Sequence, residues 1–334
     1  MTDSKVQENA WQIGSRTLPI PDGVSDELHK AIEDTPQPDV AASEQAFPKN
    51  EAEWFASIVK NDIEGAEWAR SIIAQSAVSV ETSQIEGVTV YHVIPEDIDP
   101  EHEKHLFVYI HGGAYIMGSS EAGLGEAIHI ALSAKIPILS IDYRMPPSHP
   151  FPAGLEDVVA VYKDLLRHHS ARSIALGGSS AGGGLALAAV HKFIQLGLEV
   201  PGALYTGTPW SDLTKTGDSY WINEGIDRIC ISYDNGLGQA ARLYAGGYDL
   251  KDALLSPIYG DFGGFPPTYL IAGTRDMFLS NTVRVHTKLR AAGVVADLIV
   301  FEGMSHGDYL FVADSPESQQ AYGELNTFLL RHLK

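Results

Sequence analysis

The stretch GGSSAGGG, residues 177–184, places two adjacent serines inside a run of glycines. It follows the apolar segment RSIAL and precedes the helical pattern LALAAVHKFIQL. A serine in a sharp strand-to-helix turn exposes its hydroxyl as a nucleophile, and the pattern G-x-S-x-G is typical of such a turn. Only Ser180 fits the pattern, because a turn centred on Ser179 would need glycine in place of Ala181. We therefore expect Ser180 to occupy a strained backbone turn whose glycines let the strand and helix pack closely.

Two other interpretations of a glycine-rich loop fail on the neighbouring residues. A phosphate-binding loop needs a lysine next to its last glycine, and no lysine stands near residues 177–184. A dinucleotide-binding loop needs G-x-G-x-x-G with an acidic residue about 20 positions later, which this region does not provide. The interpretation that this loop presents a nucleophilic serine is therefore the one that remains.

A serine hydroxyl is a weak nucleophile until a base accepts its proton and an acid orients that base. Around this kind of turn, the acid and then the histidine follow the serine, on loops after late strands. Asp276 follows the apolar segment TYLIAG, and His306 follows DLIVF between two glycines. We predict Asp276 as the acid and His306 as the base. Asp308 is interpreted as a residue of the loop surface or of secondary importance.

A second loop, His111-Gly112-Gly113-Ala114, follows the apolar segment HLFVYI. Its bare backbone favours N–H groups that point into a site, where the N–H of Ala181 would join them in an oxyanion hole. Each such donor is typically worth about 3 kcal/mol of transition-state stabilisation. His111 is interpreted as fixing this loop by a hydrogen bond.

Short apolar segments alternate with helical patterns from about residue 78 onward, which predicts an α/β fold. We expect an eight-stranded, mostly parallel sheet with helices on both faces, its first two strands forming an antiparallel hairpin. The expected strands are Val78–Gln84, Val88–Ile94, Leu106–Ile110, Ile136–Asp142, Ser173–Gly178, Gly202–Thr206, Thr268–Gly273 and Asp297–Phe301.

Two segments depart from this alternation. Residues 1–77 carry helical patterns, and residues 211–255 are rich in glycine and tyrosine and helical only in patches. We predict that both form a helical cap over the carboxyl edge of the sheet, where open α/β sheets bind ligands. The catalytic core is then expected at 78–210 and 256–334.

The chain of 334 residues carries 23 Lys and Arg against 43 Asp and Glu, a formal net charge of −20. Nucleic acids and anionic membranes need a positively charged surface, so neither is expected as a partner. Its one cysteine, Cys230, excludes an internal disulfide and a cysteine-based metal site. No secretory signal and no apolar stretch of the roughly 18 residues that span a bilayer is visible. We expect a cytoplasmic protein without membrane insertion.

Four stretches together resemble the hormone-sensitive-lipase-like branch (bacterial family IV) of the α/β-hydrolase superfamily. HGGAYIMG is similar to the family's HGGG loop, and GSSAGGG is similar to its GDSAGG elbow. DYRMPPSHPFPAGLED is similar to the signature DYRLAPEHPFPAALED, and TPWSDLT with SPIYGDFGGFPPTYLIAGTRD resembles the segment before the catalytic acid. The resemblance runs from about Val88 to the C-terminus and implies an α/β-hydrolase fold with a cap. It also implies that two copies of the chain can pair along the strand Asp297–Phe301 in a homodimer.

This resemblance implies a serine carboxylic-ester hydrolase that acts on small to medium acyl esters, without metal or cofactor. Ser180, Asp276 and His306 correspond to the family's catalytic triad, which works through an acyl-enzyme. The oxyanion donors correspond to the N–H groups of Gly113, Ala114 and Ala181, while Gly112 braces the loop or contributes. The substrate pocket is expected to be walled by Tyr115, Met117, Trp210 and Phe278.

Three departures from the family pattern bear on the site. Ser179 stands where the family usually has aspartate, which changes the hydrogen bonds of the elbow. Ala114 replaces the third glycine of the loop, and the hole is expected to survive if the φ angle there is negative. MPPS replaces LAPE and removes a glutamate, with little catalytic effect expected.

Two other functions stay open beside ester hydrolysis. A lactone hydrolase would use the same triad, and GTRDMFLSN with GVVADLIVFEGMSH resembles bacterial acetyl-hydrolases and monoterpene lactone hydrolases. A non-catalytic small-molecule receptor is less favoured, because the plant gibberellin receptors on this fold lack the histidine that this chain has at His306. An amidase is less favoured too, because nothing in the sequence suggests a device for amine leaving groups.

Overall fold

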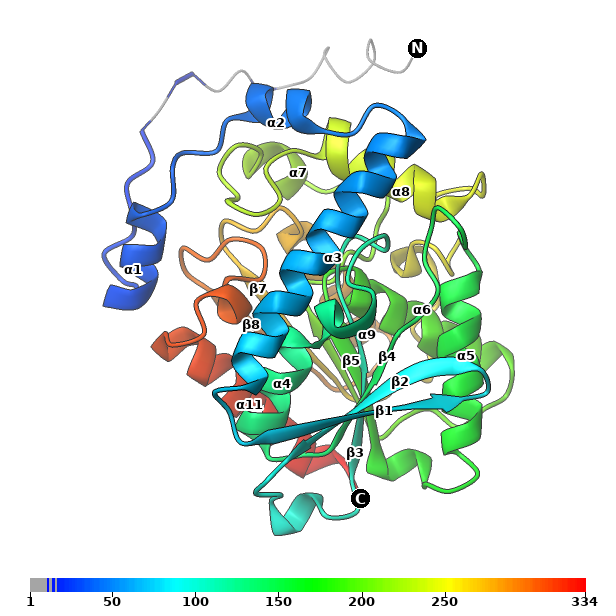
Figure 1. Cartoon of the computed structure of the whole chain (residues 1–334). Coiled ribbons are helices and arrows are strands. Elements are labelled where there is room, and N and C mark those ends of the chain that lie inside the picture. Colours follow the sequence, from blue (N-terminus) through cyan, green and yellow to red (C-terminus); the bar gives the residue numbers. More distant parts are fainter. Residues whose placement is uncertain (1–10, 12–13, 16) are drawn as a thin grey trace.

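The central sheet has eight strands in the order β1-β2-β4-β3-β5-β6-β7-β8. Figure 1 shows this sheet, among its covering helices, in the computed structural model, which describes residues 11, 14, 15 and 17–334. The strands are β1 (Val78–Ile85), β2 (Val88–Pro95), β3 (Leu106–Ile110), β4 (Ile138–Ile141), β5 (Ile174–Ser179), β6 (Ala203–Gly207), β7 (Thr268–Gly273) and β8 (Ala296–Phe301). Every strand lies within two residues of its expected bounds, so the predicted fold class is confirmed.

Strand direction follows from the lengths of the connections. Only Glu86 and Gly87, both with positive φ, join β1 to β2, and such a two-residue turn makes an antiparallel hairpin. β2 also runs antiparallel to β4, and the remaining neighbours in the sheet are parallel to one another. The carboxyl ends of β3, β5, β6, β7 and β8 therefore meet at one edge of the sheet.

Helices cover both faces of the sheet, as the continuous burial of the central strands requires. Alternate residues of β3 show this: Val108 and Ile110 belong to the hydrophobic core under α5 and α6, whereas Phe107 and Tyr109 belong to the core under α4 and α11. The helices are α1 (Asp26–Glu33), α2 (Val40–Ala46), α3 (Glu51–Ile73), α4 (Gly125–Ala134), α5 (Ala153–Leu165), α6 (Ala181–Gln195), α7 (Ser219–Ile222), α8 (Gly238–Ala245), α9 (Leu279–Ala291), α10 (Asp308–Phe311) and α11 (Pro316–His332). Among the described residues, no helix is both long enough and apolar enough to cross a bilayer.

The long helix α3 crosses the molecule close to α4, as Figure 1 shows. Its N-terminus is capped by Asn50, whose side chain accepts a hydrogen bond from the N–H of Glu53 at 3.0 Å. Asp62 Oδ1 accepts the N–H of Gly118 at 2.7 Å, so α3 holds the loop that follows β3. Residues 1–10, 12, 13 and 16 of the predicted N-terminal cap segment lie outside the described residues.

The strand β8 lies at the edge of the sheet, where only β7 pairs with it. This is the position that the predicted contact between two copies along 297–301 requires. The dimer itself stays a prediction.

Replacing Asp62 by alanine tests the contact between α3 and the loop after β3. We expect the Asp62→Ala variant to lose about 1–2 kcal/mol of unfolding free energy, because the N–H of Gly118 loses a charged acceptor. Denaturation in urea measures the loss. Asp62→Asn keeps an oxygen acceptor and serves as the matched control, with a smaller loss expected; equal stability of all three proteins would contradict the argument.

Candidate active site

Ser180 lies in the turn between β5 and α6 with φ 58° and ψ −124°, a strained conformation for a residue with a side chain. Its N–H donates to the carbonyl of Gly207 at 2.8 Å, and its carbonyl accepts the N–H of Trp210 at 2.9 Å. A Cβ atom on Gly178 or Gly182 would collide with the carbonyl oxygen of Ile110 at the end of β3. The glycines are therefore needed for the close approach of the elbow to β3, in addition to the turn.

The loop after β3 lies directly against this elbow. A Cβ atom on Gly112 would stand 3.1 Å from the carbonyl oxygen of Ser179 and 3.4 Å from the Cβ of Ser180. Within the part of the chain that the structure describes, no hydrogen-bond acceptor is recorded for the N–H groups of Gly113, Ala114 and Ala181. Free backbone donors beside a serine hydroxyl are the arrangement that stabilises an oxyanion.

The oxyanion hole was expected to survive the replacement of glycine by Ala114 if the φ angle there were negative. This condition is not met, because the φ of Ala114 is +55°. Gly113 and Tyr115 also have positive φ, at +105° and +64°, so the chain coils tightly here. The carbonyl of Gly113 accepts the N–H groups of Ile116 and Met117 at 3.0 and 2.9 Å, which satisfies the turn internally. A left-handed conformation costs roughly 1–2 kcal/mol for each L-residue, so packing must hold this loop.

Tyr115 supplies that packing and is not a wall of the pocket. Its ring stacks on Tyr244 with centroids 4.1 Å apart, and its hydroxyl donates to the carbonyl of Trp210 at 2.9 Å. Trp210 and Phe278 stack on each other at 5.3 Å. All three side chains are fully buried in the core and do not line the cavity, whereas Met117 does. An aromatic residue is common both in the wall of a pocket and in the core. Only the tertiary packing therefore shows that these three side chains lie in the core.

Asp276 and His306 come together from the loops after β7 and β8. His306 Nδ1 lies 3.1 Å from Asp276 Oδ1, which leaves the other ring nitrogen free of the acid. Asp276 is fully buried, and its Oδ1 also accepts the N–H of Phe278 at 2.7 Å. Thr208, after β6, donates its hydroxyl proton to Asp276 Oδ2 and lies 3.0 Å from His306 Nδ1. Thr208 was not predicted from the sequence, because no local sequence pattern indicates its contacts with Asp276 and His306.

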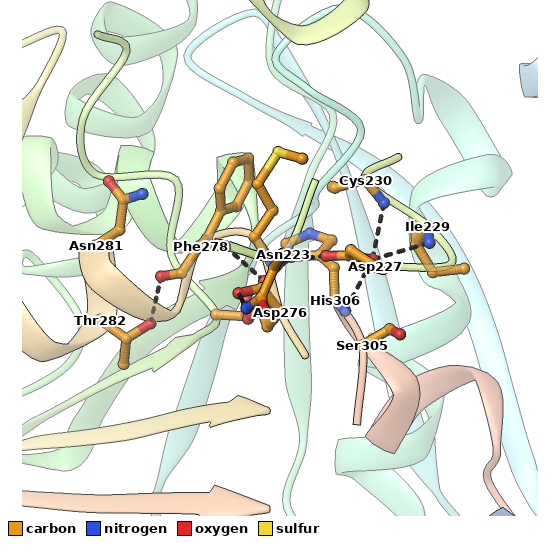
Figure 2. Close-up of polar contacts among 12 residues, drawn as sticks. Asn223, Asp227, Ile229, Cys230, Asp276, Phe278, Asn281, Thr282, Ser305 and His306 are labelled. Atoms are coloured by element: carbon orange, nitrogen blue, oxygen red, sulfur yellow. Dashed lines mark hydrogen bonds and ion pairs between the residues drawn. The ribbon is translucent and has the colours of Figure 1, made fainter. Parts of the chain in front are cut away.

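The segment 211–255 braces this pair with two polar side chains, which Figure 2 shows. Asn223, at the end of α7, donates to the carbonyl oxygen of Asp276 at 2.8 Å. Asp227 accepts the N–H of Met277 at 2.7 Å and that of His306 at 3.3 Å. Neither residue was predicted, because the contacts join positions at least 50 residues apart.

Burial and the charge of Asp276 raise the pKa of the Asp227 carboxyl to about 6. Burial also raises the pKa of the Cys230 thiol, to about 11, so that Cys230 is neutral near pH 7. Burial lowers the pKa of the His306 imidazole, whereas the neighbouring Cys230 and Asp276 raise it, and the net pKa lies well above its ordinary value of 6.5. Since Cys230 is neutral, the Asp276 carboxylate is the charge that stabilises an imidazolium at His306.

Two neighbouring residues also have defined places. His111 donates its Nδ1–H to the carbonyl of Gly112 at 2.8 Å, and its ring stacks on Tyr143 at 4.2 Å. Asp308 is buried and paired with Arg228 at 2.6 Å, so its interpretation as a surface residue was wrong. An ion pair inside the protein explains how this carboxylate tolerates burial.

A cavity of about 330 Å³ opens on these groups. Ser180 and His306 line it together with the loop after β3, and the segment 211–255 contributes Ile229, Cys230 and Leu237. Further walls come from Met117, Ala122, Leu310 and Phe311. Among the described residues, no three His, Cys, Asp or Glu side chains are grouped so as to hold a metal ion.

Known proteins share both the sequence and the architecture. Residues 107–310 match the family described as the alpha/beta hydrolase fold. An acetyl-hydrolase of Streptomyces hygroscopicus is 30% identical over 244 residues, which cover 72% of this chain and 81% of that protein. An esterase of Acinetobacter venetianus is 27% identical over 249 residues, covering 74% of this chain and 82% of that one.

Solved structures agree with these sequence matches. The crystal structure of one esterase shares 54% identity and a TM-score of 0.96, covering 98% of this chain and 100% of its own. An esterase from the bacterial hormone-sensitive lipase family shares 31% identity and a TM-score of 0.79 over 93% of this chain and 99% of its own. The chain therefore belongs to the hormone-sensitive-lipase-like branch, bacterial family IV, of the α/β-hydrolases.

Proposed function

We propose that the protein hydrolyses small to medium acyl esters with Ser180 as nucleophile, His306 as base and Asp276 as the acid that orients it. The family membership makes the chain a carboxylic-ester hydrolase, a carboxylesterase. The observation that carries the residue assignment is the 3.1 Å contact between His306 Nδ1 and Asp276 Oδ1 in loops that share a cavity with the strained turn at Ser180.

In the first half of the reaction, Ser180 Oγ forms a bond to the ester carbonyl carbon while its proton passes to His306. The carbonyl oxygen takes up negative charge and accepts hydrogen bonds from the N–H groups of Gly113, Ala114 and Ala181. When the tetrahedral intermediate collapses, the bond to the alcohol oxygen breaks and that oxygen takes the proton from His306. The product is an acyl-enzyme on Ser180.

In the second half, water attacks the acyl carbon and gives its proton to His306. Collapse of this second intermediate returns the proton to Ser180 Oγ and releases the carboxylic acid. The Asp276 carboxylate stabilises the imidazolium that forms twice in each cycle.

The proposed cap consists of the N-terminal helices and the segment 211–255. The two parts act differently: residues 229, 230 and 237 face the cavity, while α3 acts through the loop after β3, by way of Asp62 and Gly118. Apolar walls and a volume of about 330 Å³ favour compact acyl or alcohol groups.

Replacing Ser180 by alanine removes the nucleophile. We expect the Ser180→Ala variant to lose about 10⁶-fold in kcat, because the remaining groups then act alone. Hydrolysis of p-nitrophenyl butyrate measures the loss, and a circular dichroism spectrum checks the fold. Substantial turnover by Ser180→Ala, together with loss of turnover in Ser179→Ala, would show that the other serine is the nucleophile.

The raised pKa of His306 predicts the pH dependence of kcat/KM. His306 must be neutral to accept a proton, so activity falls when the pH drops through its pKa. Because that pKa lies above 6.5, we expect the acidic limb of the profile above pH 6.5. In Asp276→Asn the stabilising charge is lost, so the limb moves to lower pH and the plateau drops. A limb that stays in place in this variant would contradict the role of Asp276.

A panel of p-nitrophenyl esters with acyl chains from acetyl to palmitoyl, beside several lactones, tests the substrate class. We expect the highest kcat/KM on the shorter esters, because the cavity limits the bound group. A clear preference for the lactones would favour the lactone hydrolase. The absence of turnover on every compound, in protein that still binds an ester analogue, would instead support a receptor.

A further inference from the structure

A second carboxylate, Glu126 in the first turn of α4, is buried behind the elbow with 2% of its surface exposed. Its Oε1 accepts the hydroxyl protons of Ser179 at 2.6 Å and of Tyr205 at 2.7 Å. Its Oε2 accepts the hydroxyl proton of Tyr109 at 2.9 Å. The ester-hydrolysis steps described above make no use of this group.

The hydroxyl groups around Glu126 form a directed chain. Ser179 has one hydroxyl proton and gives it to Glu126, so the contact of 2.7 Å between Ser179 Oγ and the hydroxyl of Tyr309 must be a donation by Tyr309. The hydroxyl group of Tyr205 also donates its one hydrogen bond to Glu126. The hydroxyl groups of Tyr109, Ser179, Tyr205 and Tyr309 then each have an acceptor, and the carboxylate is the group on which the chain ends.

These hydroxyls come from the segments that carry the proposed catalytic groups. Ser179 immediately precedes Ser180, and Tyr309 lies three residues after His306 in α10. Tyr109 is in β3, two residues before His111 and the loop of the oxyanion donors. Tyr109, Glu126, Ser179 and Tyr309 also line the same cavity as Ser180 and His306.

We propose that Glu126 is a positioning residue that fixes the nucleophile elbow, the oxyanion loop and the His306 loop relative to one another through Ser179, Tyr109 and Tyr309. The carboxylate that the family usually carries in the elbow, at the position of Ser179, is supplied here by α4 and reaches the elbow through the serine hydroxyl. This inference rests on the proposed function.

Glutamine at position 126 is the sharpest test, because it keeps the shape but places an NH₂ donor among hydroxyl donors. We expect Glu126→Gln at pH 8 to lower kcat by roughly 10- to 100-fold, since small misplacements of catalytic groups have effects of this size. KM should change by less than about threefold, because glutamine keeps the shape of the side chain and the apolar walls of the cavity stay in place. The exposed Glu324→Gln on α11 is the matched control and should keep the wild-type kcat.

A rescue experiment separates positioning from a purely structural role. Ser179→Asp alone puts a second buried carboxylate against Glu126, and like charges at this distance repel strongly. Combining Ser179→Asp with Glu126→Gln restores a single carboxylate, now in the elbow. We expect the double variant to recover kcat to within about tenfold of wild type and to exceed both single variants. A double variant no better than either single one would overturn the proposal.

A second measurement follows the reaction of Ser180 itself and can be applied to variants of which a part is misfolded. It also distinguishes failure of this proposal from failure of the proposed function. Diethyl p-nitrophenyl phosphate should form an adduct on Ser180, detected by intact mass, and its rate of formation should fall with kcat in Glu126→Gln. Tyr309→Phe keeps the ring and removes one donor, so it should show a smaller fall of about three- to tenfold. An unchanged rate in both variants overturns the role of Glu126. Failure of the wild-type protein to form any adduct overturns the assignment of Ser180 instead.

Discussion

The close approach of the elbow to the end of β3 is the constraint on which the rest of the site depends. The turn at Ser180 has a positive φ, and it can lie against the carbonyl of Ile110 only because residues 178 and 182 have no Cβ atom. The same approach brings Gly112, in the loop after β3, against the backbone of Ser179 and the Cβ of Ser180. One steric condition thus positions both the proposed nucleophile and the backbone N–H groups that would stabilise the oxyanion formed by its attack.

The proposed acid, Asp276, and the proposed base, His306, are held by a different means. They lie on loops after β7 and β8, whose ends the parallel sheet places close together, but loops alone do not fix a side chain within the tolerance that catalysis needs. The segment 211–255 supplies that precision through Asn223 and Asp227, which bind the backbone next to Asp276 and at His306. Ile229 and Cys230 donate to the same Asp227 oxygen, at 2.9 and 3.0 Å, and face the cavity. The Asp227 carboxylate therefore joins the wall of the cavity to the pair formed by Asp276 and His306.

Local patterns account for what the sequence could predict. The sheet was predicted from the periodicity of its strands, and the turn at Ser180 from the spacing of its glycines. Asp276 and His306 were predicted because functional loops follow strands. Burial of Tyr115, Trp210 and Phe278 was not predictable, because an aromatic residue near a cavity and one beneath it have the same sequence context. The positive φ of Ala114 stands next to the anchored Tyr115, whose contacts with Trp210 and Tyr244 join positions 95 and 129 residues apart. Long-range polar contacts such as Ser179 with Glu126 leave no local pattern at all.

The serine at position 179 is best understood through the number of buried charges that the elbow can hold. Glu126 is surrounded by hydroxyl donors that satisfy one carboxylate, and a second carboxylate at 179 would share that space and repel it. Where α4 supplies the negative charge, position 179 must therefore be a neutral residue that can both donate and accept, and serine meets both needs. Burial raises the pKa of Glu126, and the hydroxyl groups around it lower it, so removal of any one donor would favour the protonated form. The residue type at 179 and the acid at 126 thus depend on each other, although 53 positions separate them in the chain.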